Sequence, residues 1–285
     1  MDSTDGSEDS AEISACNRKQ LSEEEEAKLQ AQNSRLVPEF KARQLELQAQ
    51  KHWDLFYKRN ETRFFKDRRW TTREFEELLS DPSEEPKVML EVGCGVGNFI
   101  FPLIEEKRNN YFYYACDFSA RAVEFVRNHE LYDPTRVKAF QCDITDGESL
   151  LQNIPAGSVD IVTMIFVLSA IHPEKFKQVI GNLHKVLKPG GVVLFRDYGL
   201  YDMAQIRFKP GHKIAENFYM RQDGTRSYYF STEEIEHIFL EEGFETLVNS
   251  YAHRRTINAK EGIDVPRIFV QSKFRKKNND GFSER

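Results

Sequence analysis

The sequence LEVGCGVGNF (90–99) decides the fold, because it leads from an apolar strand-like run through a glycine-rich turn into a helix. Gly93, Gly95 and Gly97 permit a tight turn and a close backbone approach to a ligand. The start of the following helix offers free N–H groups. A glycine loop alone is a weak signal, so its meaning depends on the rest of the chain.

Short apolar runs alternate with helical stretches on both sides of this loop. One helix is expected over 119–129, opened by Ser119, and another over 173–188, opened by Pro173. Alternation at this spacing predicts βαβ units and a parallel sheet. The strand-like runs are 88–92, 111–117, 137–143, 159–169 and 191–198.

The C-terminal part adds a helix over 231–244 and two strand-like runs, 246–258 and 265–275. The turn region between these runs contains Gly262, which favours an antiparallel hairpin at the sheet end. Five parallel strands followed by a hairpin match the seven-stranded sheet of class I (Rossmann-like) methyltransferases. We therefore expect an α/β fold with a seven-stranded, mostly parallel sheet and helices on both faces.

Four segments divide the chain. Residues 1–33 are acidic and expected to be poorly ordered, apart from a charged helix over 22–32. The 200–230 stretch fits no helix or strand of this plan; it follows the fifth strand beside the crevice of an open α/β sheet, where substrate recognition is its natural role. Residues 34–80 form a basic and aromatic segment in which a helix is expected over 36–60. The methyltransferase domain covers 81–275, and a basic tail follows at 276–285.

The net charge of −6 over 285 residues comes from the N-terminus. Residues 1–30 hold nine acids against three bases, so the remainder carries 37 of each and is neutral. A part of the chain without net charge does not repel nucleic acid. The acidic start argues against a presequence or signal peptide, and a cytosolic or nuclear location fits best. No run is long enough to span a membrane, and four cysteines without a C-x-x-C pair favour no metal site.

Two carboxylates strengthen the glycine loop as a nucleotide-cofactor site. Asp117 ends the second strand, where it can bind two ribose hydroxyls, and Asp143 follows the third, where it can meet an adenine amino group. A dinucleotide fold requires G-x-G-x-x-G, but Asn98 replaces the third glycine. The spacing resembles motif I of S-adenosylmethionine-dependent methyltransferases. That cofactor has no pyrophosphate to bind.

The exit of the fourth strand limits which atom is methylated. Residues 164–174 lack the [DN]-P-P-[YF] motif of exocyclic amine methylation, and neither 164–172 nor 191–198 holds the cysteine that cytosine C5 methylation needs. A nucleophile with a ready lone pair, such as a ring nitrogen, remains open and needs alignment more than a base. His172 is either a base or, as we favour, a cap of the loop before Pro173.

Two basic regions favour a polyanionic substrate. Residues 51–73 hold eight bases against three acids together with both tryptophans, Trp53 and Trp70, and residues 254–277 hold eight bases against two acids. Interleaved aromatic and cationic side chains suit stacking on bases and neutralising phosphates. The alternative for 51–73 is a segment that packs its aromatics on the sheet and solvates its charges.

Several runs together resemble the tRNA N3-methylcytidine methyltransferases. They are WDLFYKRN, FFKDRRW, LEVGCGVGN, ACDFS, QCDIT, IFVLSAIHP, LFRDYGLYD and FYMRQDGTRSYYF, spread between about Gln48 and Phe274. The resemblance implies methyl transfer from S-adenosylmethionine to N3 of cytidine 32 in the tRNA anticodon loop. The short length resembles the branch acting on serine tRNAs, which implies seryl-tRNA synthetase as partner. We expect a monomer.

The same resemblance assigns roles to individual residues. Trp53 and Tyr57 would close over the cofactor, Gly93 and Gly95 would approach its methionine part and Asp117 its ribose. Asp143 and Ile144 would contact the adenine, and Ile165 would line the floor. The target base would lie against Arg68, Asp197 and Tyr198.

Asp197 is the candidate catalytic residue, because a carboxylate near the base would stabilise the cationic product. Two other functions remain open. One is an RNA- or synthetase-binding adaptor that has lost turnover, and the other is a methyltransferase of proteins or small molecules.

Overall fold

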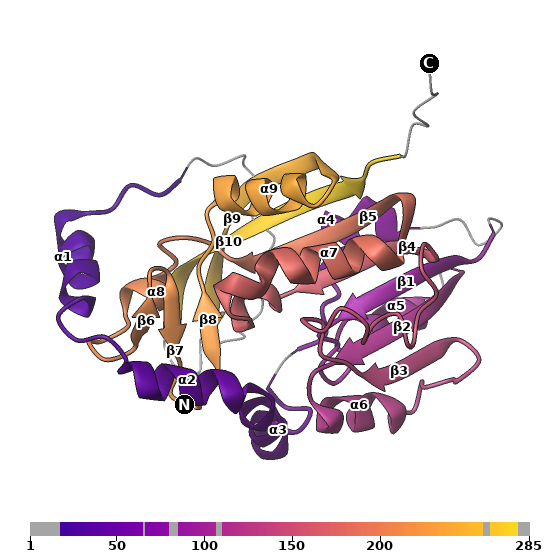
Figure 1. Ribbon diagram of the computed structural model, residues 1–285, viewed down its shortest axis with the longest axis horizontal. Coiled ribbons are helices and arrows are strands. Elements are labelled where there is room, and N and C mark those ends of the chain that lie inside the picture. Colours follow the sequence, from indigo (N-terminus) through magenta and orange to yellow (C-terminus); the bar gives the residue numbers. More distant parts are fainter. Residues whose placement is uncertain (1–17, 65, 80–84, 107–109, 259–262, 279–285) are drawn as a thin grey trace.

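The computed structural model describes residues 18–64, 66–79, 85–106, 110–258 and 263–278 (Figure 1). A seven-stranded sheet in the order β3-β2-β1-β4-β5-β10-β9 forms its centre. Neighbouring strands from β3 to β5 are parallel, and β10 pairs antiparallel with both β5 and β9. This confirms the expected α/β fold. The strands are β1 (Lys87–Val92), β2 (Tyr111–Asp117), β3 (Val137–Gln141), β4 (Val159–Ile165), β5 (Leu187–Tyr198), β9 (Phe244–Asn258) and β10 (Ile263–Lys276).

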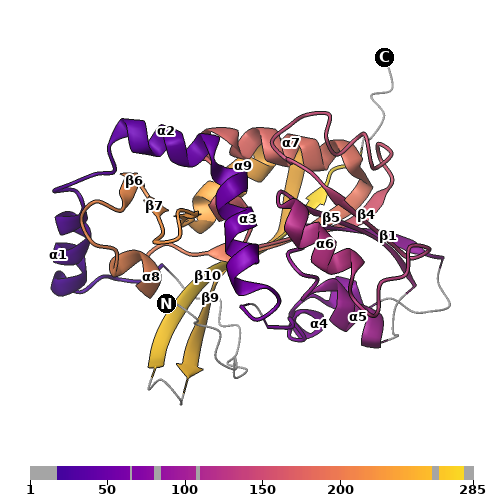
Figure 2. The same ribbon diagram turned by 90° about the horizontal axis from the view of Figure 1, so that it is seen from below.

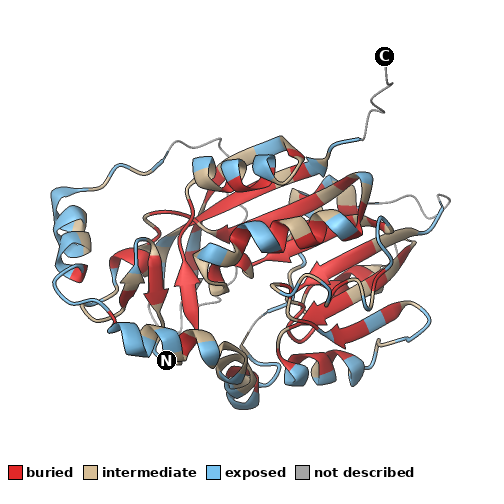
Figure 3. Cartoon of the chain, viewed as in Figure 1, coloured by how far each residue is buried: buried red, intermediate tan, exposed pale blue. Residues whose placement is uncertain are grey.

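Helices cover both faces of the sheet, which is why most residues of β1, β2, β4 and β5 are buried (Figure 3). On one face α5 (Ile100–Glu106) and α6 (Ala120–Arg127) pack with the short α4 (Thr71–Glu74) and η1 (Glu76–Leu78) region. On the other face lie α7 (Phe176–Val186) and α9 (Thr232–Glu241). Successive side chains of a strand point to opposite faces, so the strands contribute to both apolar clusters. Two short 3-10 turns, η2 (Leu168–Ala170) and η3 (Pro173–Lys175), follow β4.

The N-terminal part of the described chain forms three successive helices before α4, of which the first lies beside α8 (Met203–Ile206) of the 200–230 stretch (Figure 2). The single helix expected over 36–60 is wrong: α2 (Glu39–Leu47) and α3 (Ala49–Asn60) are separated at Gln48, whose φ and ψ leave the helical region. In this way α2 runs toward α7 while α3 packs beside α6. The sequence of 36–60 does not show this break, because the directions of α2 and α3 depend on their contacts with distant parts of the chain.

Of the acidic segment 1–33, which is expected to be poorly ordered apart from one charged helix, the structure describes residues 18–33. The charged helix within it is confirmed as α1 (Glu23–Gln32), which begins with a capping box between Ser22 and Glu25. The Gln32 side chain is 1% exposed and donates to the backbone carbonyls of Gln205 and Phe208. Residues 1–17 lie outside the described residues.

The 200–230 stretch takes no part in the seven-stranded sheet and forms a small unit of its own. Gln32 accepts a hydrogen bond from Tyr219 within it, so α1 docks against this unit. Three short strands form an antiparallel sheet in the order β6-β7-β8. Its runs of three residues are too short for a periodic pattern to identify. The elements are α8 (Met203–Ile206), β6 (Lys213–Ala215), β7 (Phe218–Met220) and β8 (Arg226–Tyr228).

Part of the basic and aromatic segment has a structural role. The Arg196 guanidinium, on β5, is 4.2 Å from the centre of the Trp70 ring and 2.8 Å from a Glu74 carboxylate oxygen. The other Glu74 oxygen lies 2.7 Å from Arg254 on β9. Arg196 is fully buried and Arg254 is 6% exposed. Trp70 therefore packs on the sheet, which is the alternative to nucleic-acid binding considered for residues 51–73.

Replacing Glu74 with alanine should lower the free energy of unfolding by about 3–5 kcal/mol, because two buried guanidiniums lose the carboxylate they share. Urea denaturation of both proteins measures this difference. Glu76→Ala, two residues along and exposed, is the matched control and should change stability by less than about 0.5 kcal/mol. Equal losses in the two variants would contradict the assigned role of Glu74.

Candidate active site

A cavity of about 300 Å³ opens at the carboxyl ends of β1, β2 and β4. This volume suits a small-molecule ligand. The eight residues expected to bind the cofactor all line it, and so does Arg68. Those eight are Trp53, Tyr57, Gly93, Gly95, Asp117, Asp143, Ile144 and Ile165.

The glycine loop forms the floor beside β1, and its backbone explains its composition. Gly93 has φ +65°, and a Cβ built there would lie 2.4 Å from the Val167 side chain. Gly95 has φ +54°, and its Cβ would lie 3.1 Å from the Tyr57 hydroxyl oxygen. Both positions therefore combine a left-handed backbone with close neighbours, which glycine alone satisfies without strain.

The Asp117 carboxylate connects this loop to the second strand. One oxygen accepts the Gly95 N–H at 2.9 Å and the other accepts the Ser119 N–H at 2.9 Å. Burial raises the pKa of Asp117 from 3.8 to about 6, although those hydrogen bonds oppose the shift. The contribution of this group to the free energy of unfolding is therefore greatest at low pH and falls as the pH rises through about 6.

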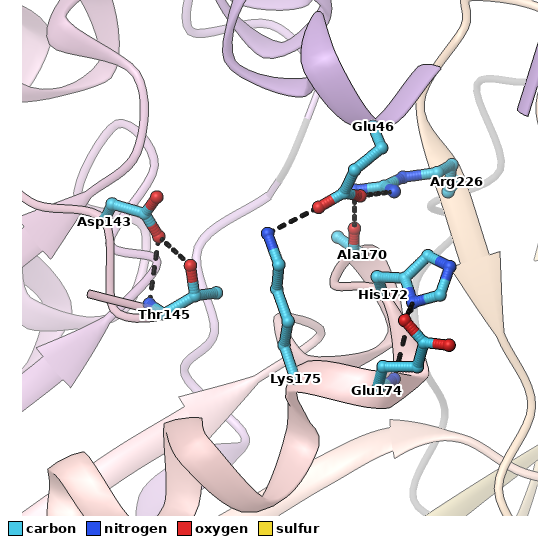
Figure 4. A network of polar contacts seen from close by, with 8 residues as sticks. All are labelled: Glu46, Asp143, Thr145, Ala170, His172, Glu174, Lys175 and Arg226. Carbon is cyan, nitrogen blue, oxygen red and sulfur yellow. Dashed lines mark hydrogen bonds and ion pairs between the residues drawn. The ribbon is translucent and has the colours of Figure 1, made fainter. Parts of the chain in front are cut away.

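Asp143 occupies the corresponding place after β3. Its Oδ1 accepts from the Thr145 N–H at 2.9 Å and from the Thr145 hydroxyl at 2.8 Å, which fixes the turn (Figure 4). Ile144 and Thr145 line the cavity beside it. A carboxylate on a rigid turn next to an apolar side chain suits a flat heterocycle with an exocyclic amine.

Glu91 is a cavity residue to which the sequence analysis gave no role. It is 5% exposed, and its Oε2 has no hydrogen-bond partner among the described residues. Burial raises the pKa of its carboxyl well above the usual range, although the Arg68 cation opposes the shift. A buried acceptor without a partner is costly, so this oxygen marks a place for a donor from a ligand.

Arg68 and the exit of β4 form the far side of the cavity. Arg68 donates to the Ile165 carbonyl at 3.1 Å, and its guanidinium lies 5.5 Å from the centre of the Phe166 ring. Phe166 has φ +59°, which is rare for an aromatic residue and typical of functional sites. No sequence pattern around Phe166 predicts this backbone conformation. A cation and an aromatic ring thus stand side by side where a planar base could enter.

Asp197 and Tyr198 do not line the cavity, and their expected contact with the target base stays a prediction. Asp197 is fully buried, and its oxygens accept the Ser169 and Tyr198 N–H groups at 2.9 Å each. Burial raises its pKa from 3.8 to about 6. The carboxylate joins the end of β5 to the loop after β4. The Tyr198 ring reaches the cavity only through Phe166, 5.1 Å away between ring centres.

His172 caps η3, as favoured from the sequence. Its Nδ1 accepts the Glu174 N–H at 3.4 Å, and the ring lines the cavity (Figure 4). The same figure shows three further lining residues that the sequence analysis did not single out, Glu46, Lys175 and Arg226. Arg226 lies on β8, so the 200–230 insertion does reach the cavity.

Within the described parts of the chain, no group of three histidine, cysteine or acidic side chains could hold a metal ion. None of the helices described there has the length and apolar character needed to cross a membrane.

Comparisons with known proteins agree with this geometry. Residues 90–193 match the family model described as a methyltransferase domain. The fold is similar to an S-adenosylmethionine-dependent methyltransferase from Anabaena variabilis, with a TM-score of 0.57 at 14% identity over 80% of this chain and 94% of the other. A second such enzyme, from Methanosarcina mazei, gives 0.51 at 17% identity, covering 69% and 95%.

Sequence relatives are much more similar. The tRNA N(3)-cytidine methyltransferase METTL6 of Mus musculus is 59% identical, covering 91% of this chain and 92% of that protein. METTL2 of Xenopus tropicalis, with the same enzyme description, is 40% identical over 90% and 87%. The tRNA(Thr) (cytosine(32)-N(3))-methyltransferase of Saccharomyces cerevisiae is 41% identical over 87% of this chain and 40% of that protein.

The chain is an S-adenosylmethionine-dependent methyltransferase. It belongs to the tRNA N(3)-cytidine methyltransferase family.

The cavity fits this cofactor by its own chemistry. The unpaired Glu91 oxygen suits the methionine ammonium group, and Asp117 stands at the strand end where ribose hydroxyls can donate to it. Asp143 and Ile144 suit the adenine, and Tyr57 closes over the glycine loop.

Gly93→Ala should weaken cofactor binding at least about tenfold, because the methyl group meets Val167 on a left-handed backbone. Isothermal titration with S-adenosylhomocysteine measures the loss. Gly157→Ala is the matched control, since Gly157 has φ +61° but nothing within 4 Å of its Cβ. It should cost about 1 kcal/mol of stability and leave affinity intact. Unchanged affinity in Gly93→Ala would show that the loop is not at the cofactor.

Cofactor affinity should depend on pH through Asp117. Hydroxyl groups donate to the ionised carboxylate, so binding is strongest above the pKa of about 6 and weakens as the pH falls below it. The expected loss is about tenfold per pH unit for one such group. Titrations between pH 5 and 8 test this in the wild type and in Asp117→Asn, which removes the charge. Asp117→Asn should bind the cofactor weakly, and its affinity should change less with pH than that of the wild type. An equally steep pH dependence in the variant would show that another group causes it.

Proposed function

We propose that this chain methylates N3 of cytidine 32 in the anticodon loop of serine tRNAs, using S-adenosylmethionine, and that seryl-tRNA synthetase assists it. The observation that carries the reaction is the 59% identity to a tRNA N(3)-cytidine methyltransferase over nearly the full length of both chains. Position 32 is supported by the yeast relative, which is a tRNA(Thr) (cytosine(32)-N(3))-methyltransferase.

The serine branch is supported by the ranking of the relatives. Identity is 57–59% to the METTL6 proteins but 40–41% to the Xenopus and zebrafish METTL2 proteins and the tRNA(Thr) enzyme of yeast. This chain is thus less similar in sequence to the tRNA(Thr) enzyme of yeast than to the METTL6 proteins. Together with the resemblance found in the sequence, the distance favours serine tRNAs and their synthetase.

The cavity contains what this reaction requires. When bound, the cofactor supplies an electrophilic methyl group on a positively charged sulfur. The cytosine N3 lone pair would accept this methyl group, and the electron pair of the carbon–sulfur bond would stay on sulfur. N3 carries no proton in neutral cytidine, so no general base is needed. The task left to the protein is alignment and exclusion of water.

Arg68 and Phe166 are placed for this alignment. N3 lies on the pairing edge of cytosine, so the base must leave any stack and enter the cavity edge-on. The Phe166 ring offers a stacking surface, and Arg68 holds its own position through the Ile165 carbonyl.

Mass spectrometry of nucleosides tests the proposal. Serine and threonine tRNA transcripts are incubated with labelled S-adenosylmethionine, with and without seryl-tRNA synthetase. We expect labelled 3-methylcytidine in serine tRNA only, increased by the synthetase. A serine transcript with uridine at position 32 and the Asp117→Ala variant are the controls, and both should stay unlabelled.

Each part of the proposal has its own contrary result. Label in the uridine-32 transcript would refute the position, and label in threonine tRNA alone would refute the branch. An unchanged yield with the synthetase would remove it as a partner. No label in either tRNA, despite cofactor binding, would refute tRNA as the substrate.

A further inference from the structure

Helices α2 and α3 form a strap over the cavity, fixed to the sheet on one side. Gln50 donates to the Phe118 carbonyl at 3.3 Å, and the Ser119 hydroxyl donates to Asp54 at 2.5 Å. Both attachments lie directly after β2, next to Asp117. Trp53 and Tyr57, which line the cavity, lie on α3 in the same stretch of the strap.

On the other side the Glu46 carboxylate fastens the strap, together with the hydrogen bond that the Val37 N–H, just before α2, donates to the Lys213 carbonyl at 2.8 Å. Glu46, near the end of α2, lies 2.5 Å from the Lys175 ammonium nitrogen and also contacts the Arg226 guanidinium (Figure 4). Arg226 donates in addition to the Ala170 carbonyl at 3.2 Å. Glu46 therefore joins α2 to the loop after β4 and to the 200–230 insertion at once.

The charges make this contact stronger than a surface ion pair. The Arg226 side chain is only 6% exposed, and that of Glu46 is 27% exposed. Burial raises the pKa of the Glu46 carboxyl, but Lys175 and Arg226 outweigh burial and hold it below its usual range. The group is thus ionised at neutral pH. Partly buried pairs with one carboxylate between two cations lose more on disruption than exposed pairs do.

We propose that Glu46 is a positioning residue for the cofactor: its contacts with Lys175 and Arg226 latch the strap shut and thereby set how fast the cofactor leaves. A cofactor bound in the cavity would lie against Trp53 and Tyr57, which line it, so its exit would require the strap to lift. The attachments at Phe118 and Ser119 serve as the fixed side, and the Glu46 contacts are those that must break. The Glu46 latch acts through Trp53 and Tyr57 and plays no part in the methyl transfer itself.

The test compares Glu46→Gln with Glu39→Gln. Glu39 lies on the same helix, but its side chain is 90% exposed and it pairs only loosely with Arg43, at 3.4 Å. Stopped-flow tryptophan fluorescence follows release of S-adenosylhomocysteine, with Trp53 at the cavity as the reporter. We expect Glu46→Gln to speed release about tenfold and to raise the KM for S-adenosylmethionine, with kcat at saturating cofactor little changed. Glu39→Gln should match the wild type.

Lys175→Gln supplies a second variant, since Lys175 is 42% exposed and its loss leaves Arg226 paired with Glu46. It should speed release by a smaller factor. Wild-type release rates in both variants would overturn the proposal, as would a loss of kcat without a change in release. Because release needs no tRNA, the result stands apart from whether serine tRNA is the substrate.

Discussion

The Asp117 carboxylate holds together the parts that make this cavity. It binds the backbone N–H of Gly95 in the glycine loop and that of Ser119 at the start of α6. The Ser119 hydroxyl in turn donates to Asp54 of the strap. Burial of this group costs stability at neutral pH, as its raised pKa shows. The chain thus retains a charge in its interior to fix a ligand-binding edge.

A similar arrangement orders the opposite side of the cavity. Asp197 at the end of β5 binds the Ser169 backbone in the loop after β4 and lies beyond the cavity wall. The same loop supplies Phe166 with its positive φ and Val167, which leaves no room for a side chain at Gly93. Two buried carboxylates, on β2 and on β5 with β1 and β4 between them, therefore fix the loops on both sides of the site.

The basic and aromatic segment divides between structure and function. Trp70 packs on a buried arginine of β5, whereas Trp53 and Tyr57 face the cavity from α3. Arg68 also reaches the cavity, although it lies only two residues before Trp70. One run of similar residues therefore serves both the core and the active site. Residue types alone could not separate the two roles, because an aromatic ring suits either environment.

The sequence by itself determined the parallel sheet with its hairpin, the glycine loop, and the places of Asp117 and Asp143. These features follow from local periodicity and from residues that must stand at strand ends. Only the tertiary structure decided that Glu46, Lys175 and Arg226 meet, that Gln32 docks on the insertion, and that Asp197 is enclosed. The physical reason is that such contacts join segments as much as 187 residues apart, and their energy depends on burial and geometry that no local pattern encodes.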